Sequence, residues 1–148
     1  MGTKTTSSKK QIQSSGVGNS VVFHDQVAVA AADVGAADVI QPVIVAAGTY
    51  VHKVRTKTTD LDSNVTPTLT AKIGFTPVDG SAAPSGADTA VSADAAWGQA
   101  AEVKSFDVIP PYLVEKDSYL NIVVGTGSAT AAAGTVSAVV EGEGVGAA

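Results

Sequence analysis

The sequence predicts an all-β protein whose strands form an antiparallel β-sandwich. Its 148 residues include 23 Val and 15 Thr but only four Leu and four Glu, and β-branched side chains favour strands over helix interiors. Apolar and polar residues alternate in several short segments, which is the period of a half-buried strand. Turns rich in Gly and Pro separate these segments, as is typical of a sandwich rather than of a helical bundle.

Seven segments carry the strand pattern. The clearest is 66–76, in which Leu69, Ala71, Ile73 and Phe75 point to one face while Thr, Lys and Gly point to the other. Segment 39–46 is almost continuously apolar, which predicts a strand that is covered on both faces or lies at an interface. The other expected strands are residues 21–32, 50–58, 101–109, 119–124 and 135–141.

The connections between these strands are short except for one. Residues 78–98 are rich in Ala, Ser, Gly, Asp and Pro, and we expect a long loop with a short helical turn at 93–97. Trp97, the only tryptophan, is expected either to anchor this loop on the sandwich or to contact a partner. Pro110 and Pro111 are expected to end the strand 101–109, because proline cannot donate to a strand ladder.

The chain divides by charge and composition into an extended N-terminal arm, residues 1–18, and a β-sandwich domain, residues 19–148. The arm holds too little apolar area to offset its ordering, so we expect it to be flexible in isolation. It carries Lys4, Lys9 and Lys10 and no acid, whereas the domain has six basic and 14 acidic residues, a net charge of −8. Three lysines neutralise too few phosphates for strong nucleic-acid binding. Such an arm can instead wrap a protein partner.

A basic stripe is expected on the strand 50–58. Alternation places Lys53, Arg55 and Lys57 on one face, and His52 with Val54 on the other. The stripe is interpreted as a solvated strand face or as a patch that fits an acidic neighbour; basic side chains also deter edge-to-edge pairing. The candidate partner-binding residues are therefore Lys4, Lys9, Lys10, Lys53, Arg55 and Lys57.

The sequence predicts no catalytic, cofactor or metal site. Cysteine is absent, and the two histidines, His24 and His52, lie on separate expected strands, where a structural role is favoured. Asp60 and Asp62 belong to a D-x-D-x-N run that opens like a calcium loop. That loop needs a glycine and a glutamate at positions that this chain fills with Val65 and Ala71, so a solvated turn is favoured over a weak cation site.

The longest uncharged stretch, residues 118–140, has the length of a membrane span, but Asn121, Gly125 and Gly127 interrupt it. We interpret it as strand, loop, strand, and expect no membrane partner.

The arrangement of turns and strands resembles a known class of virion protein. The resemblance is carried by residues 47–54 (AGTYVHKV), the threonine-rich strand 66–76, and the ending 117–127 (DSYLNIVVGTG) with 131–134 and 136–141. These runs are similar to those of tailed-phage capsid decoration proteins, also called cement proteins. The resemblance extends over about residues 39–141 and rests on a D-x-Y-L/I-x-I/V strand, a small-residue loop and a closing valine-rich strand.

The resemblance implies a jelly-roll-like β-sandwich that sits on the capsid exterior as a homotrimer between capsomers. Its partners would be the major capsid protein and copies of itself, and its role would be to stabilise the shell by bridging neighbouring major capsid subunits. The arm departs from the family pattern, whose members begin close to their first strand.

Three other classes stay open on sequence grounds. One is a receptor- or carbohydrate-binding module of a head fibre or tail appendage. Such a module needs an exposed aromatic surface, and the chain has only one Trp, three Tyr and three Phe. The second is a hydrolase built on a β-sandwich, and the third is the shell protein of a small virus, whose arm would normally be more basic.

Overall fold

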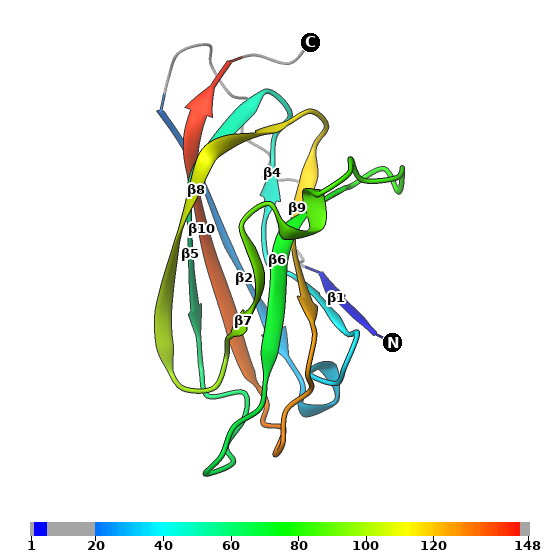
Figure 1. The fold of residues 1–148 in the computed structure, drawn as a ribbon, viewed down its shortest axis with the longest axis vertical. Helices are drawn as coiled ribbons and strands as arrows, with labels where there is room; N and C mark the ends of the chain where they lie inside the picture. The colour runs from blue at the N-terminus through cyan, green and yellow to red at the C-terminus, as the bar shows by residue number, and fades with distance from the viewer. Residues whose placement is uncertain (1, 6–19, 146–148) are drawn as a thin grey trace.

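The protein folds into two β-sheets that pack face to face, as the sequence predicts (Figure 1). The computed structural model describes residues 2–5 and 20–145. One sheet has four strands, paired antiparallel throughout, in the order β2 (Ser20–Val29), β10 (Gly134–Gly144), β5 (Thr49–Thr58) and β8 (Glu102–Val114).

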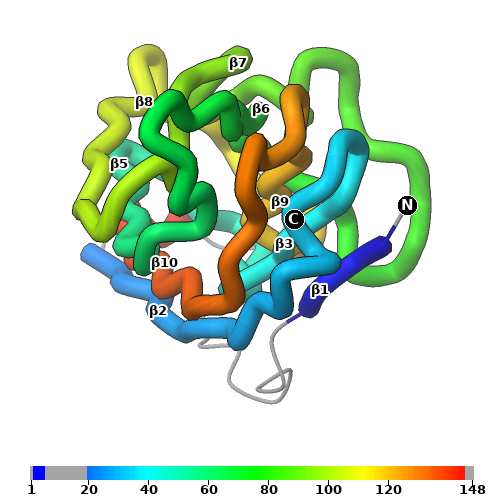
Figure 2. Tube along the Cα trace, turned by 90° about the horizontal axis from the view of Figure 1, so that it is seen from below, coloured from blue at the N-terminus to red at the C-terminus, as the bar shows by residue number. Residues whose placement is uncertain are grey.

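The second sheet has shorter strands and a mixed edge. Its order is β1 (Thr3–Thr5), β3 (Val39–Gln41), β9 (Ser118–Val124), β6 (Thr70–Pro77) and β7 (Ser92–Ala96), and β4 (Ile44–Val45) also pairs with β9. All its pairings are antiparallel except that of β1 with β3, which is parallel. Seen along the sandwich, β1 lies at the margin beside β3 (Figure 2).

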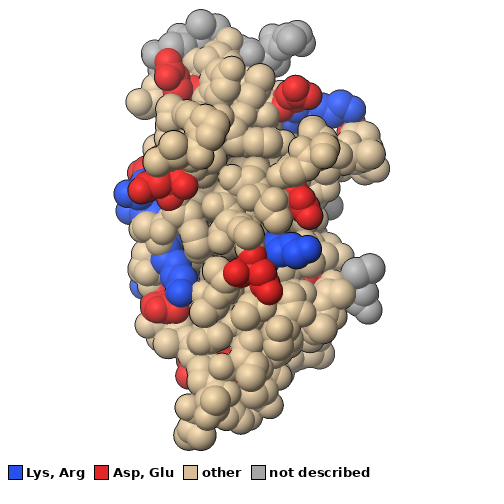
Figure 3. Space-filling view, viewed as in Figure 1, with Lys and Arg blue, Asp and Glu red and all other residues tan. Residues whose placement is uncertain are grey.

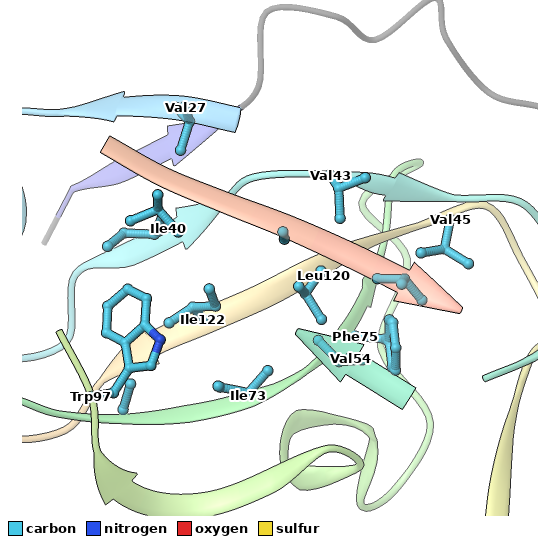
Figure 4. Close-up of a cluster of buried hydrophobic side chains, with 14 of the residues drawn as sticks. Val27, Ile40, Val43, Val45, Val54, Ile73, Phe75, Trp97, Leu120 and Ile122 are labelled. Carbon is cyan, nitrogen blue, oxygen red and sulfur yellow. The ribbon is translucent and has the colours of Figure 1, made fainter. Parts of the chain in front are cut away.

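The core lies between the sheets and follows their registers (Figure 4). In the second sheet Ile40, Ile122 and Ile73 stand opposite one another on three neighbouring strands. In the first sheet a row runs across all four strands through Phe23, Val140, Val54 and Phe106. Aliphatic and aromatic cross-strand neighbours of this kind are the main stabilising pairs of a sheet. The alternation in 66–76 therefore predicts the buried face correctly.

The apolar segment 39–46 is buried but is not one strand. Pro42 divides it into β3 and β4, which both pair with β9. A proline has no N–H to give to a ladder, so a continuous strand is broken at that point. The expected burial is confirmed, since Ile40, Val43, Ile44 and Val45 are all buried.

The prolines at 110 and 111 do not end their strand, contrary to the sequence prediction. β8 continues to Val114, with a cis peptide bond between Ile109 and Pro110. Residues 108–111 have no partner in β5, because the register moves from Asp107 directly to Tyr112. β8 is the edge strand of its sheet, where prolines within an irregular stretch cost few ladder bonds.

His52 lies outside the core, which corrects its expected place on the apolar face. Relative to β10, β5 carries one extra residue between Val51 and Lys53, so a β-bulge shifts the alternation by one position. As a result Val51 and Val54, three residues apart, both point inward while His52 is exposed. Gly142 makes room for the bulge: an added Cβ would lie 2.3 Å from the carbonyl oxygen of Tyr50.

The long connection 78–98 contains more structure than expected. A short 3-10 helix, η2 (Ala87–Thr89), packs on β6 at Gly74, where a Cβ would lie 2.0 Å from the carbonyl oxygen of Ala87. The predicted helical turn at 93–97 is wrong, because Ser92–Ala96 form β7 and pair with β6. A second short 3-10 helix, η1 (Ala31–Asp33), follows β2.

Of the arm 1–18, the structure describes residues 2–5, and Thr3–Thr5 form β1. The expected boundary at residue 18 falls outside the described residues.

The segment 118–140 is confirmed as strand, loop and strand. Within residues 2–5 and 20–145, no helix has the length and apolar character to cross a membrane.

Candidate interaction surfaces

The basic stripe of Lys53, Arg55 and Lys57 lies on the outer face of the four-stranded sheet, in mid-sheet on β5. It is interleaved with acids from both neighbouring strands. Lys53 stands opposite Glu141 of β10 and Asp107 of β8, and the Arg55 guanidinium lies 3.0 Å from the Glu141 carboxylate. Figure 3 shows basic and acidic side chains mixed along the side of the molecule where β5 and β8 lie.

The sheet face around the stripe therefore carries both charge signs and is not a basic patch. The Arg55 and Glu141 side chains are 43% and 38% exposed, so their ion pair contributes only about 0.2–1 kcal/mol. A shallow groove of about 470 Å³ opens near one end of this face, lined by both charge signs: His52, Lys53, Asp107 and Glu141, with Ser20, Val21, Val22 and Gly142.

The lysines of the arm are not brought to this stripe. Lys4 lies on β1 at the edge of the other sheet, where its ammonium is 3.5 Å from the carboxylate of Asp33. Lys9 and Lys10 lie outside the described residues. The four described candidates thus occupy two separate surfaces, and Lys4, Lys53 and Arg55 each have an acidic side chain in contact or directly opposite.

A second surface is the site where β1 binds to β3, which we call the β1 slot: residues 38–41 with Asp33 and Asn121. The backbone N–H of Gly2 donates to Asp38 Oδ1 at 2.7 Å, and the Thr5 hydroxyl donates to Gln41 Oε1 at 2.8 Å. Asp38 and Gln41 are each only 8% exposed. A buried carboxylate or amide is costly without hydrogen-bond partners, so these contacts hold β1 specifically.

The sequence holds little signal for the β1 slot. Thr3–Thr5 has no apolar periodicity and is too short to be recognised as a strand. Its partners Asp38 and Gln41 lie 36 residues further along the chain. Only the polar residues within and beside the apolar run 39–46 could have indicated that something polar is bound there.

Asp62 joins two loops at one end of the sandwich. Its carboxylate is buried and accepts four backbone N–H donors: Thr68 at 2.8 Å, Leu69 at 3.2 Å, Ala129 at 3.0 Å and Thr130 at 2.9 Å. Burial alone would raise the pKa of this carboxyl group, but the four donors outweigh it and lower the pKa from 3.8 to about 2. We call this arrangement the Asp62 clamp.

The solvated turn expected for the D-x-D-x-N run is wrong at its middle residue, because Asp62 is buried. Asp60 Oδ1 accepts the N–H of Asp62, Asn64 Oδ1 accepts the N–H of Thr66, and the Asn64 amide donates to Thr130 Oγ1 at 2.9 Å. These oxygens are used by backbone donors of the chain. Among the described residues, no group of three or more His, Cys, Asp or Glu is placed to hold a metal ion.

The tips of the loops held by the Asp62 clamp form an uncharged end of the molecule. Figure 3 shows no Lys, Arg, Asp or Glu side chain at its lowest part. Val65 there is fully exposed. Its neighbours are small and polar, so this end offers hydrogen-bonding groups without charge.

Trp97 belongs to the core, which confirms the loop-anchor interpretation. It is 1% exposed, and its indole N–H donates to Thr56 Oγ1 at 3.1 Å. The bond satisfies the indole donor inside an apolar cluster, as buried tryptophans require. Trp97 is consequently not available as an aromatic contact for a glycan or another partner.

The comparisons with known proteins point to phage capsids. The sequence matches no protein-family profile and no curated protein sequence. Among solved structures, a chain described as "Cyanophage Pam1 capsid asymmetric unit" is 25% identical over 93% of this chain and 96% of its own length, with a TM-score of 0.69. A chain of the "Capsid of Ralstonia phage GP4" superposes with a TM-score of 0.71 over 87% of both chains, at 21% identity. The chain therefore shares its β-sandwich fold, over nearly its whole length, with chains of two phage capsids.

Proposed function

We propose that this protein is a structural component of a phage virion that decorates the capsid exterior and stabilises the shell by bridging neighbouring major capsid subunits. The observation that carries the proposal is the match to a Pam1 capsid chain over 93% of this chain and 96% of that one. Almost the full length of this chain corresponds to almost the full length of the other, so the likeness is not confined to a few strands of a common sandwich.

The surface chemistry supports a binding role. The two histidines are exposed and lie on different strands, and His52 Nε2 is 3.9 Å from the carboxylate of Glu143. The sandwich domain, residues 19–148, has a net charge of −8. Because this charge repels phosphates, it supports protein rather than nucleic-acid partners. Many modest polar contacts, repeated over many copies on a shell, would supply the stabilisation.

Self-association as a homotrimer is part of the proposal. A symmetric trimer places three equivalent surfaces toward the shell, so each decoration unit would contact several capsid subunits at once. The receptor- or carbohydrate-binding alternative loses its main support, because the single tryptophan is buried.

The test compares virions that contain this protein with virions assembled without it. Genome release is followed by a DNA-binding dye as the temperature is raised, at ordinary and at low ionic strength. We expect particles without the protein to release DNA at lower temperature, and the purified protein to restore the difference when it is added back. Equal release temperatures for both kinds of particle would overturn the stabilising role.

A further inference from the structure

The two polar side chains of the β1 slot are held by groups of the sandwich as well as by β1. Asp38 Oδ2 accepts the N–H of Gly35 at 2.9 Å, which leaves Oδ1 directed at Gly2. The Gln41 side-chain amide donates to Asn121 Oδ1 at 3.0 Å, which leaves Oε1 for the Thr5 hydroxyl. Both side chains are thus oriented by groups of the sandwich itself. The slot would be the same with any chain that supplied residues 2–5.

The occupant, in contrast, is a small unit at the end of a long connection. β1 has three residues and, among residues 2–5 and 20–145, pairs with β3 alone. The 14 residues 6–19 join it to β2, and a chain of that length reaches at most about 50 Å. A domain of about 130 residues has a radius of gyration of about 14 Å. The connection therefore allows β1 to reach the slot of a neighbouring copy that touches its own sandwich.

We propose that residues 2–5 of one copy bind in the β1 slot of a neighbouring copy, so that arms exchanged around a closed ring hold the subunits together. The inference rests on the self-association in the proposed function and names the contact that produces it. Every hydrogen bond of the slot is the same whether β1 comes from the same chain or from another. What differs is the result: only the exchanged arm links two subunits.

The setting of the proposed function favours exchange. Copies placed side by side on a shell present their neighbours' arms at high effective concentration, and each exchanged arm adds a link without a new interface. A ring satisfies every slot with every arm, as closed symmetry requires. The polar contacts also give the exchange specificity, since Lys4 pairs with Asp33 at 3.5 Å beside the two hydrogen-bonded anchors.

The absence of cysteine from the chain allows a direct test. Thr5 and Gln41 are paired across β1 and β3, and their side chains are in contact, so the double variant Thr5→Cys/Gln41→Cys is suited to a disulfide. After oxidation of the full-length protein, the proposal predicts covalent oligomers on a denaturing gel without reductant, and monomers once reductant is added. The matched control is Gln26→Cys/Ser137→Cys, a pair on β2 and β10 that must link within one chain.

Two outcomes would overturn the exchange. One is a disulfide at positions 5 and 41 that leaves the protein monomeric on the gel, which would show that each slot holds its own arm. The other is free thiols at both positions while the control pair is fully oxidised, which would show that β1 does not occupy the slot. If either occurs while the untreated protein still forms trimers and binds capsid shells, only the exchange fails. If the protein neither self-associates nor binds shells, the proposed function fails as well.

Discussion

The Asp62 clamp and the β1 slot each use buried polar side chains to hold a segment that is distant in sequence. They differ in the number of hydrogen bonds that hold the segment. Asp62 is buried at one end of the sandwich and receives four backbone donors from two loops. The β1 slot holds a three-residue edge strand, and Asp38 receives one donor from it. We infer that the clamp is a permanent part of the fold, whereas the slot holds a segment that can be exchanged.

The largest effect is expected for removal of the clamp. Asp62→Ala leaves four backbone N–H groups without their acceptor at a buried position, so we expect the free energy of unfolding to fall by about 3 kcal/mol. For a chain of this size the melting temperature would drop by roughly 6–12 °C, measured by circular dichroism. Asp60→Ala is the matched control, because Asp60 is exposed and accepts one bond, from the N–H of Asp62. Equal effects of the two substitutions would contradict the clamp.

The clamp also predicts how stability depends on pH. The pKa of Asp62 in the folded protein is about 2, below the ordinary value of 3.8. The ionised carboxylate therefore stabilises the fold fully above about pH 4, and this stabilisation is lost as the pH falls toward 2. We expect a loss of about 1–2 kcal/mol across that window. Denaturant titrations of the wild type and of Asp62→Asn, which cannot titrate, should converge by that amount at low pH; a constant difference would refute the assignment.

The β1 slot should be easier to open than the clamp. Gln41→Ala removes the acceptor of the Thr5 hydroxyl and the donor to Asn121, and we expect a loss of about 1 kcal/mol. The effect should concentrate on β1. Hydrogen exchange followed by mass spectrometry should show protection of residues 3–5 falling about fivefold, since 1 kcal/mol corresponds to that factor. Gln26→Ala, at an exposed position of β2, should leave this protection unchanged.

The smallest effect is expected on the outer sheet face. A double-mutant cycle of Arg55→Ala and Glu141→Ala should give a coupling of about 0.2–1 kcal/mol, because both side chains are partly exposed. The coupling should weaken in high salt. A coupling as large as the clamp effect would mean that this surface pair is a structural anchor, and the contrast between buried and exposed polar contacts would fail.

Sequence patterns predict the parts of this fold that depend on near neighbours. Alternation correctly places Lys53, Arg55 and Lys57 on the outer face of β5, and Leu69 and Phe75 in the core. These positions follow from the two-residue period of a strand, which needs no knowledge of the rest of the chain.

The errors arise where a distant partner decides the local structure. His52 is displaced by a bulge at which the register of β5 shifts relative to both β10 and β8, and Gly142 of β10 makes room for it. Ser92–Ala96 has the composition of a helical turn but becomes a strand by pairing with β6.

The interaction sites are the least predictable features. Asp62 is held in part by backbone groups 67 and 68 residues away, and Asp38 by one that is 36 residues away. No local motif records such contacts. The kind of particle, in contrast, is indicated by the resemblance of residues 39–141 to phage virion proteins, and the two solved capsid chains that share the fold support it.

The most direct test of the structural role is binding of the purified protein to capsid shells that lack it. Shells and protein are mixed over a range of concentrations and sedimented together, and the bound copies per particle are counted by quantitative mass spectrometry. We predict saturable binding with a fixed number of copies, in whole multiples of three. Binding that does not saturate, or protein that stays in the supernatant at every concentration, would contradict the proposal that this chain decorates a capsid.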